Sequence, residues 1–591
     1  MRSPGPVIAT VAAVAIPMAL LAVFFAWPVG AMLARGIAPR AFEALGSDRT
    51  WELVATTLRM AAIGTLGSVL LGVPGAYALY VCRFPGQRAL RAVATVPFVL
   101  PTVVVGVAFR SVLGKEGAYS WLELDGTETA VVAAMVFFNF SVIVRTVGAM
   151  WAGLDPRSAD AARMLGAGPV RVFRTVTFPA LMPALASGAS LVFLFCSTAY
   201  GIVMTLGGVS TLESEIWART NRLNFDVAAG LSLAQFVIVA LALVVSSRIS
   251  HPMPLPMANR KLRMRRADLP AVTFTVSVIV TLIVAPMASL VARSFMHEDR
   301  WSLENYRQLA TAGSGFTGGV TVIDALGNSM RAAGYATLVA LGIGIPLAFA
   351  LSRPTLSRRG RLWQRLAEGF AMAPLGVSSV TVGFGFLIAL RGPPLQLGSE
   401  AVPFAQAIVA VPMVLRALLP VLRAIDPRLR EAAALLGAGP ARVARTVDLV
   451  LAARGLALAV GFALAISLGE FGASSFLVSG ENDTLPVLIS RLLNRPGADN
   501  YGMALAASVI LGLLTAFIMF VCEARRDPSS SSSSSGSTSS GIEEGLVTID
   551  SYSSATKEGL TAKGGLATEG SAAMENSATN NSSAIGGGFS D

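Results

Sequence analysis

Few residues in this 591-residue chain have the types and spacing that enzymatic chemistry requires. A phosphate-binding loop needs Gly-Lys followed by Ser or Thr, but the only Gly-Lys pair, Gly114-Lys115, is followed by Glu116. The 3 cysteines and 2 histidines are widely separated, a pattern that predicts neither a disulfide framework nor a metal site. No zinc-protease His pair or serine-nucleophile motif is present. We therefore expect no metal ligand, no cofactor bound by this chain and no catalytic residue.

The spacing that does carry information is a motif that occurs twice. Residues Asp155–Val176 return without a gap as Asp426–Val447, at an offset of 271 (426 minus 155). Each copy opens with Asp-Pro, an N-cap acceptor followed by the residue best tolerated at the first helical position. A short helix should follow and end at Gly166 or Gly437, since glycine suits a left-handed cap. Each copy thus predicts a helix-turn-helix that another protein can approach closely.

The elements around these two loops are strongly apolar. Hydrophobic residues make up 54% of the chain and charged residues 14%, with a mean hydropathy of +0.65. A membrane span needs about 20 apolar residues, and about twelve runs meet this length, which predicts an all-α polytopic membrane protein. The predicted spans are Val7 to near Met32, 53–80, 90–113, 129–151, 180–206, 227–247, 271–292, 330–351, 368–390, 401–422, 451–478 and 502–522.

The repeat divides the chain into two halves. We predict a first half at 1–250, a cytoplasmic linker at 251–269, a second half at 270–525 and a disordered tail at 526–591. The tail is rich in Ser and Gly and cannot bury enough apolar surface to fold. Each half holds about six spans, and an even number returns the chain to its starting side, so the halves should be parallel repeats.

The net charge of +11 is concentrated in short loops. Arginine and lysine cluster at 83–91, 248–266 and 353–365, which fall on one side of the predicted topology, while acidic residues gather in the intervening loops. This positive-inside bias predicts a multi-pass protein of the lipid bilayer with both termini cytoplasmic. It accounts for the basic charge without nucleic acid as a partner.

The repeated motif resembles the EAA loop of the permease subunits of binding-protein-dependent ABC importers, whose pattern is Glu-Ala-Ala, three residues, then Gly. The second copy fits fully, and the first has Asp in place of Glu. The matching positions are Asp160, Ala161, Ala162 and Gly166 in the first copy and Glu431, Ala432, Ala433 and Gly437 in the second. One departure is that Phe178-Pro179 has the family's proline after the loop, whereas the second half reads Asp448-Leu449-Val450.

The resemblance covers residues from about 50 to 523 and implies the partners. In this family each loop forms a coupling helix that docks on a cytoplasmic ATPase subunit. It therefore implies two ATPase copies, which use ATP and Mg²⁺, and an extracytoplasmic solute-binding protein. Thr205–Gly208 and Ser467–Gly472 resemble the fused permeases of thiamine and ferric-iron importers. Sulfate, polyamine or phosphonate permeases and a secondary transporter remain alternatives.

Glu470 is the candidate pathway residue. It falls late in the eleventh predicted span, and ionisable groups inside a span are costly and tend to face partners or water. A structural carboxylate paired with an arginine or a backbone donor is an equally consistent interpretation.

Overall fold

The computed structural model describes residues 14–249, 262–263, 266–298, 300–314, 319–353, 357–390, 397–478 and 480–524. These residues are almost entirely helical, so the predicted all-α class is confirmed. The strands form two short pairs, parallel β1 (Cys82–Arg83) with β2 (Leu262–Arg263) and antiparallel β3 (Met296–His297) with β4 (Arg300–Trp301). Most of the predicted linker and the whole predicted tail lie outside the described residues.

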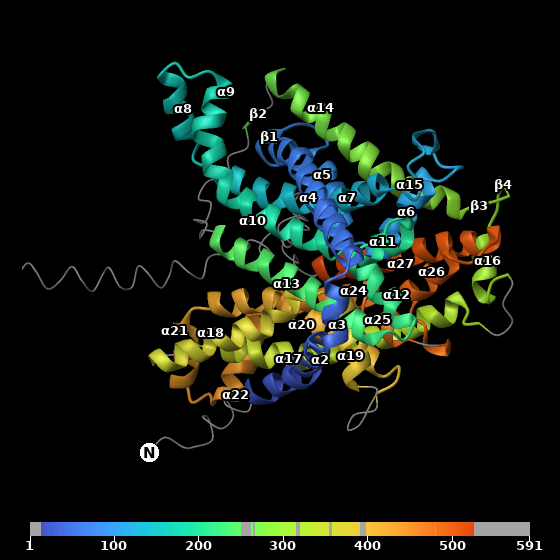
Figure 1. The fold of residues 1–591 in the computed structure, drawn as a ribbon. Helices are drawn as coiled ribbons and strands as arrows, with labels where there is room; N and C mark the ends of the chain where they lie inside the picture. The colour runs from blue at the N-terminus through green and yellow to red at the C-terminus, as the bar shows by residue number, and fades with distance from the viewer. Residues whose placement is uncertain are drawn as a thin grey trace, which may run out of the picture.

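The helices of the first half follow one another with short connections (Figure 1). They are α2 (Trp27–Gly36), α3 (Pro39–Leu45), α4 (Asp48–Ala76), α5 (Gln87–Thr95), α6 (Thr102–Leu113), α7 (Glu128–Gly153), α8 (Pro156–Met164), α9 (Pro169–Val172), α10 (Phe178–Ser197), α11 (Tyr200–Leu206), α12 (Leu212–Asn221) and α13 (Phe225–Ile249).

The second half has a similar series of helices. They are α14 (Leu269–Val278), α15 (Ala285–Ser294), α16 (Glu304–Arg307), α17 (Val322–Leu351), α18 (Arg358–Met372), α19 (Ser379–Leu390), α20 (Ala401–Ala424), α21 (Pro427–Leu435), α22 (Pro440–Val443), α23 (Leu449–Leu451), α24 (Ala453–Gly469), α25 (Ser474–Leu477), α26 (Leu485–Leu493) and α27 (Ala498–Ala524).

The predicted number of spans agrees with the upper count that the structure allows. Among the described residues, 9 helices are long and apolar enough to cross a membrane, or up to 12 if each of 3 bent pairs is one span. The bent pairs are Gln87–Phe98 with Thr102–Leu113 (110°), Arg358–Gly376 with Ser379–Leu390 (99°), and Pro440–Leu451 with Ala453–Gly469 (74°). The predicted spans at 90–113 and 368–390 are therefore bent within their length, and the span predicted at 451–478 is bent at its start.

Proline explains two of these breaks. Pro97 lies in the turn that ends the first segment, and Pro101 is the N-cap of α6. Pro374 lies in the equivalent turn before α19. Proline has no amide hydrogen, so it cannot continue the helical hydrogen-bond ladder, and each helix changes direction near these residues. The predicted span 180–206 is also divided, because α10 ends at Ser197 and α11 begins at Tyr200.

The repeat is visible in the packing of each half. In the first half α4 packs on α7 and α10, and in the second half α17 packs on α20 and α24. α7 and α20 lie at the centre, since 78% of the most apolar stretch of α7 and 72% of that of α20 are buried. The outer surface is apolar: Ile63, Leu66 and Leu70 form an exposed stripe on α4, as Leu513 and Phe517 do on α27. Such a surface is suited to lipid.

The two halves pack on each other reciprocally. α2 of the first half packs on α19 of the second, and α15 of the second half packs on α6 of the first (Figure 1). A two-fold relation between similar units produces this exchange. At the α2–α19 contact, a Cβ on Gly385 would lie 2.8 Å from the Pro28 carbonyl oxygen. Close approach of the halves therefore depends on this glycine.

We predict that Gly385→Val destabilises the protein by about 1–3 kcal/mol, because the added side chain separates α2 from α19. Gly342→Val is the matched control, since Gly342 also lies in a long helix but has open space around its Cβ position. The measurement is thermal unfolding of both variants in detergent. Equal midpoints for the two variants would contradict the close contact.

Candidate functional site

The first repeated loop forms the helix-turn-helix that the sequence predicts. α8 begins after Asp155, whose carboxylate accepts a hydrogen bond of 2.9 Å from the Arg157 amide. The chain turns at Gly166, which has a φ of +82° and so adopts the left-handed conformation that favours glycine. α9 follows directly. Both the predicted cap and the predicted turn are confirmed.

The second loop repeats this geometry. The Asp426 carboxylate accepts a hydrogen bond of 2.9 Å from the Arg428 amide at the start of α21. Gly437 has the same φ of +82° as its counterpart, and α22 follows. The two loops are therefore nearly the same local structure, although one has Asp160 where the other has Glu431.

Both loops present large apolar side chains to the surroundings. Leu165 and Leu436 are each 90% exposed, and Met164 and Leu435 are each 88% exposed. Exposed apolar side chains grouped on a polar loop are typical of a surface that binds another protein. Among the other predicted site residues, Ala162 and Ala433 are half-buried and the following are exposed: Asp160, Ala161, Gly166, Glu431, Ala432 and Gly437.

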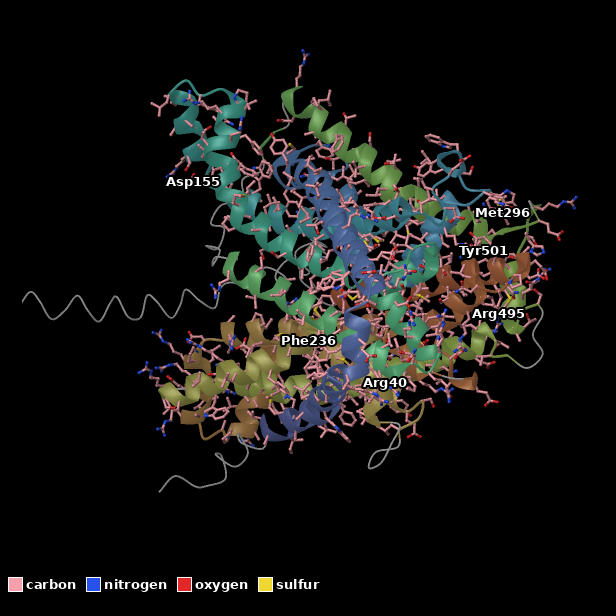
Figure 2. The ribbon with its side chains drawn as sticks, in the orientation of Figure 1. Arg40, Asp155, Phe236, Met296, Arg495 and Tyr501 are labelled. Atoms are coloured by element: carbon pink, nitrogen blue, oxygen red, sulfur yellow. The ribbon has the colours of Figure 1, made fainter. Side chains whose placement is uncertain are left out.

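The two loops lie at the same end of the molecule. Figure 1 shows α8 with α9 and α21 with α22 along one side, well separated from each other. Figure 2 shows Asp155 on that side and Met296 and Tyr501 on the opposite side. One partner on each loop could therefore approach from the same face of the membrane.

The acidic residues of the two loops differ in their partners. Asp160 forms an ion pair of 2.7 Å with Arg163, one turn along α8. Among the described residues Glu431 has no such partner, so its carboxylate is available to a cationic group on another protein. Asp160 pairs within its own exposed helix, where such pairs contribute little stability.

A buried carboxylate secures the second loop to the transmembrane helices. Asp448 is 0% exposed and lies in the turn between α22 and α23. It forms an ion pair of 2.7 Å with Arg430 of α21 and a second ion pair with Arg353, which follows α17. Arg430 also donates a hydrogen bond to the Leu422 carbonyl at 2.9 Å. The loop is therefore tied to both the preceding and the following helices.

The first loop has no equivalent of this network. At the offset of 271, Ala159 corresponds to Arg430 and Thr177 corresponds to Asp448 (430 and 448 minus 271). The helix after the first loop continues as one span over Pro169–Ser197, whereas the helix after the second is bent by 74° at Ala452. The half that lacks the family's proline is therefore also the half in which the helix after the loop is bent.

Glu470 lies in the break between α24 and α25, directly after α24 ends. This position is inside the predicted span 451–478. Its carboxylate accepts hydrogen bonds from the Ala473 amide at 2.7 Å and from the Ser474 amide and hydroxyl at 2.9 and 2.7 Å. These bonds cap the start of α25. The interpretation as a structural carboxylate with backbone donors therefore has direct support, and a role in the pathway remains a proposal.

Sequence reasoning missed a second buried acid, Glu213. It was placed in an outer acidic loop, yet it is 2% exposed on α12. The signal was available, because Thr211 and Ser214 form a capping box that opens a helix. The buried positions Leu212, Glu213, Ile216 and Thr220 then follow at helical spacing.

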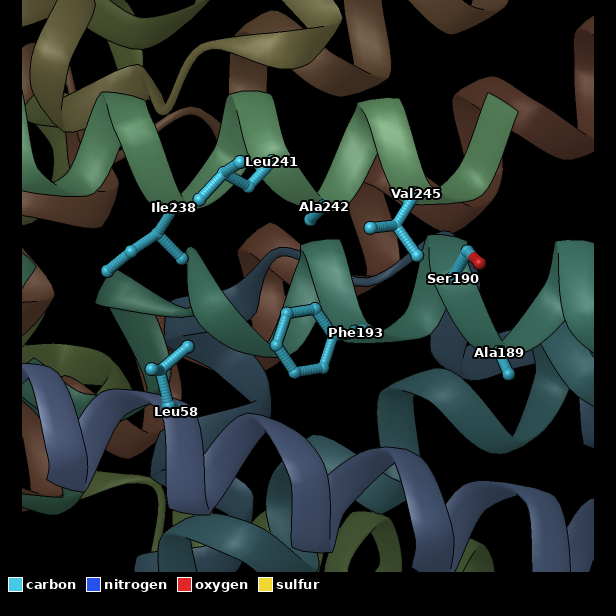
Figure 3. A pocket seen from close by; sticks show the side chains of 8 residues that line it. All are labelled: Leu58, Ala189, Ser190, Phe193, Ile238, Leu241, Ala242 and Val245. Carbon is cyan, nitrogen blue, oxygen red and sulfur yellow. The ribbon is translucent and has the colours of Figure 1, made fainter. Parts of the chain in front are cut away.

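An apolar groove of about 480 Å³ between α4, α10 and α13 is a poor candidate for a solute site (Figure 3). Its lining residues are Leu58, Ala189, Ser190, Phe193, Ile238, Leu241, Ala242 and Val245. Ser190 alone among them has a polar side chain, and a charged or polar solute needs more hydrogen-bonding groups than this. The groove fits a lipid acyl chain better.

Comparison with known proteins gives one family and a consistent set of relatives. Residues 68–251 match the family described as binding-protein-dependent transport system inner membrane component. The thiamine transport system permease protein ThiP of Brucella suis is 26% identical over 80% of this chain and 87% of its own length. ThiP of Escherichia coli is 25% identical over 80% of this chain and 88% of its own.

The molybdenum transport system permease protein ModB of Escherichia coli is 30% identical over 35% of this chain and 95% of its own length. A nearly complete relative at this identity decides the family. The chain belongs to the binding-protein-dependent transport permeases. This permease is therefore a membrane-embedded transport component of an ABC importer, and the secondary-transporter alternative is excluded. A permease of about two fifths of this length (219 residues are 95% of it, against 591 here) is consistent with two fused halves.

We predict that Asp448→Asn destabilises the permease by about 3 kcal/mol, since removing the carboxylate charge leaves the largely buried Arg430 uncompensated. Thr177→Ala, at the corresponding position of the first half, should have little effect. The measurement is again the thermal midpoint in detergent, now beside protease accessibility of the second loop. A stable Asp448→Asn variant with a protected loop would show that the network does not secure it.

Proposed function

We propose that this permease imports thiamine across the bacterial cell membrane and is driven by two copies of a cytoplasmic ATPase. One copy docks on the loop at 155–176 and the other on the loop at 426–447. ATP and Mg²⁺ are used by those partners, and this chain contributes no catalytic residue. A solute-binding protein delivers the substrate to the opposite face.

The paired loops carry this proposal. They have the same caps, the same left-handed glycine and the same exposed leucine, although 271 residues separate them (426 minus 155). Two equal docking surfaces on one face suit two equal partners. Since each loop continues into a span, at α10 and α24, movement of a docked partner is transmitted directly to the membrane helices.

The orientation follows from the charge distribution. The loops at 83–91 and 353–365 are rich in arginine, and basic loops stay on the cytoplasmic side. The docking loops belong on that side because ATP is cytoplasmic. Both termini are then cytoplasmic if each bent pair counts as one span.

The coverage of the relatives named above favours thiamine as the substrate. The two relatives named as thiamine permeases match over 80% of this chain, whereas the molybdenum permease matches over 35%. Only the former comparison extends across both halves. The direct experiment is uptake of radiolabelled thiamine by the assembled transporter in liposomes. Uptake of another solute with none of thiamine would reject the proposed substrate.

The two docking surfaces can be tested by placing a negative charge on each loop. We predict that Leu165→Glu and Leu436→Glu each weaken association with the ATPase about tenfold, because a carboxylate replaces an apolar anchor. Both side chains are 90% exposed, so folding should be unaffected. Leu223→Glu is the control, since Leu223 is 75% exposed but lies after α12, away from the loops.

The measurement is pull-down of the ATPase from detergent-solubilised membranes. If both loop variants retain the ATPase as well as the control does, the loops are not the docking elements and the proposed mechanism fails.

A further inference from the structure

Two aromatic rings close the contact between the halves on the far side from the docking loops. Tyr200 of α11 and Phe471, just before α25, occupy corresponding positions in the repeat (471 minus 200 is 271). Their rings are stacked, with centroids 5.1 Å apart and an interplanar angle of 17°. The Tyr200 hydroxyl lies 3.2 Å from the Ser475 hydroxyl. Both rings are buried, so this stack lies where the two halves meet.

Each half contributes one buried carboxylate beside this stack. Glu213 comes from the first half and Glu470 from the second, and both act electrostatically on Tyr200. Ser378 lies beside Glu213 and its neighbour Ser379 beside Glu470, so consecutive residues of the second half contact both acids. Neither acid has an acidic counterpart in the other half. The residue that corresponds to Glu213 is Pro486, since the Thr-Leu segments begin at 211 and 484.

No cation balances these acids in the described part of the chain, where neither carboxylate has an ion-pair partner. Glu470 is satisfied by the backbone of α25, but Glu213 is not. Gln235 donates to Glu213 Oε1 at 3.3 Å, and the Ser378 hydroxyl lies near enough to the carboxylate to interact with it. Oε2 is buried and accepts no hydrogen bond of normal geometry from the described residues. An unsatisfied buried oxygen is costly, and such groups are kept where a ligand uses them.

The space beside Glu213 is closed in this conformation. It has no room for a water molecule, and Ser197, Ala199 and Thr211 also line it. Burial raises the pKa of Glu213 to about 8, which keeps the carboxyl group largely neutral near pH 7. When the halves separate on this side, water reaches the group and its negative charge returns.

We propose that Glu213 and the Tyr200–Phe471 pair form a binding step for a flat organic cation on its way between the halves. Separated rings offer two π faces, and an organic cation is attracted both to such faces and to a carboxylate. Glu470 fixes the backbone that carries Phe471 and adds negative charge nearby. The inference rests on the proposed function, because the thiazolium ring of thiamine is a flat, permanently charged cation.

The test uses the whole transporter in liposomes and measures labelled thiamine transported per ATP hydrolysed. Glu213→Gln and Tyr200→Leu should each lower this ratio about tenfold, equivalent to a loss near 1.4 kcal/mol, with ATPase assembly unchanged. Glu213→Asp and Tyr200→Phe keep the charge and the ring and should retain most of the ratio. Glu215→Gln is the matched control on α12, since Glu215 pairs with Arg219 at 2.6 Å instead of facing the stack.

The outcomes separate this inference from the proposed substrate. If the unmodified transporter moves no thiamine, both fail. If it moves thiamine and Glu213→Gln and Tyr200→Leu keep the normal ratio, the cation site alone is rejected. An aspartate variant as poor as the glutamine variant would also reject it, since charge would then not be the cause.

Discussion

The need to satisfy backbone polar groups in a medium without water controls this fold. In hydrocarbon a peptide group has to find its partner within the protein, so spans are helical and breaks are tolerated only where protein surrounds them. The break after α24 follows this rule, because the Glu470 carboxylate accepts hydrogen bonds from the freed amides of Ala473 and Ser474. Breaks of this kind are satisfied by side chains of the surrounding protein, as the Glu470 carboxylate satisfies the amides of Ala473 and Ser474.

The same constraint gives the two halves different mechanical properties. The first docking loop leads into an unbroken span, while the second leads into a bend held by Asp448 and its two arginines. The ion pairs of Asp448 thus connect α21 with Arg353 after α17 and with the segment that leads into α24. At the corresponding positions the first loop has Ala159 and Thr177, which cannot form such pairs. Fusion of the halves in one chain permits this asymmetry, since each copy can diverge independently.

Local sequence signals predicted the loops well and the tertiary breaks poorly. Asp-Pro caps and the glycines at 166 and 437 act through neighbouring residues, so their geometry could be read directly. Pro97, Pro101 and Pro374 lie at two of the breaks, but the spans were predicted from the lengths of the apolar runs alone. The bend at Ala452 has no local signal, because ion pairs from Arg353 and Arg430 hold the preceding turn. Glu213 was misplaced since an acid between apolar runs suggests a solvated loop, and its burial depends on α13 and α19 packing around it.

If each loop docks one ATPase copy, as proposed, ATP binding by those partners should draw the two loops together. The most direct measurement is the distance between spin labels at Arg157 and Arg428, corresponding exposed positions on α8 and α21, by pulsed electron paramagnetic resonance. Cys522, which is half-buried, should be replaced first, while Cys82 and Cys196 are buried. The account predicts a shorter distance when the assembled transporter is trapped with ATP than without nucleotide. An unchanged distance, in a complex that still transports, would contradict it.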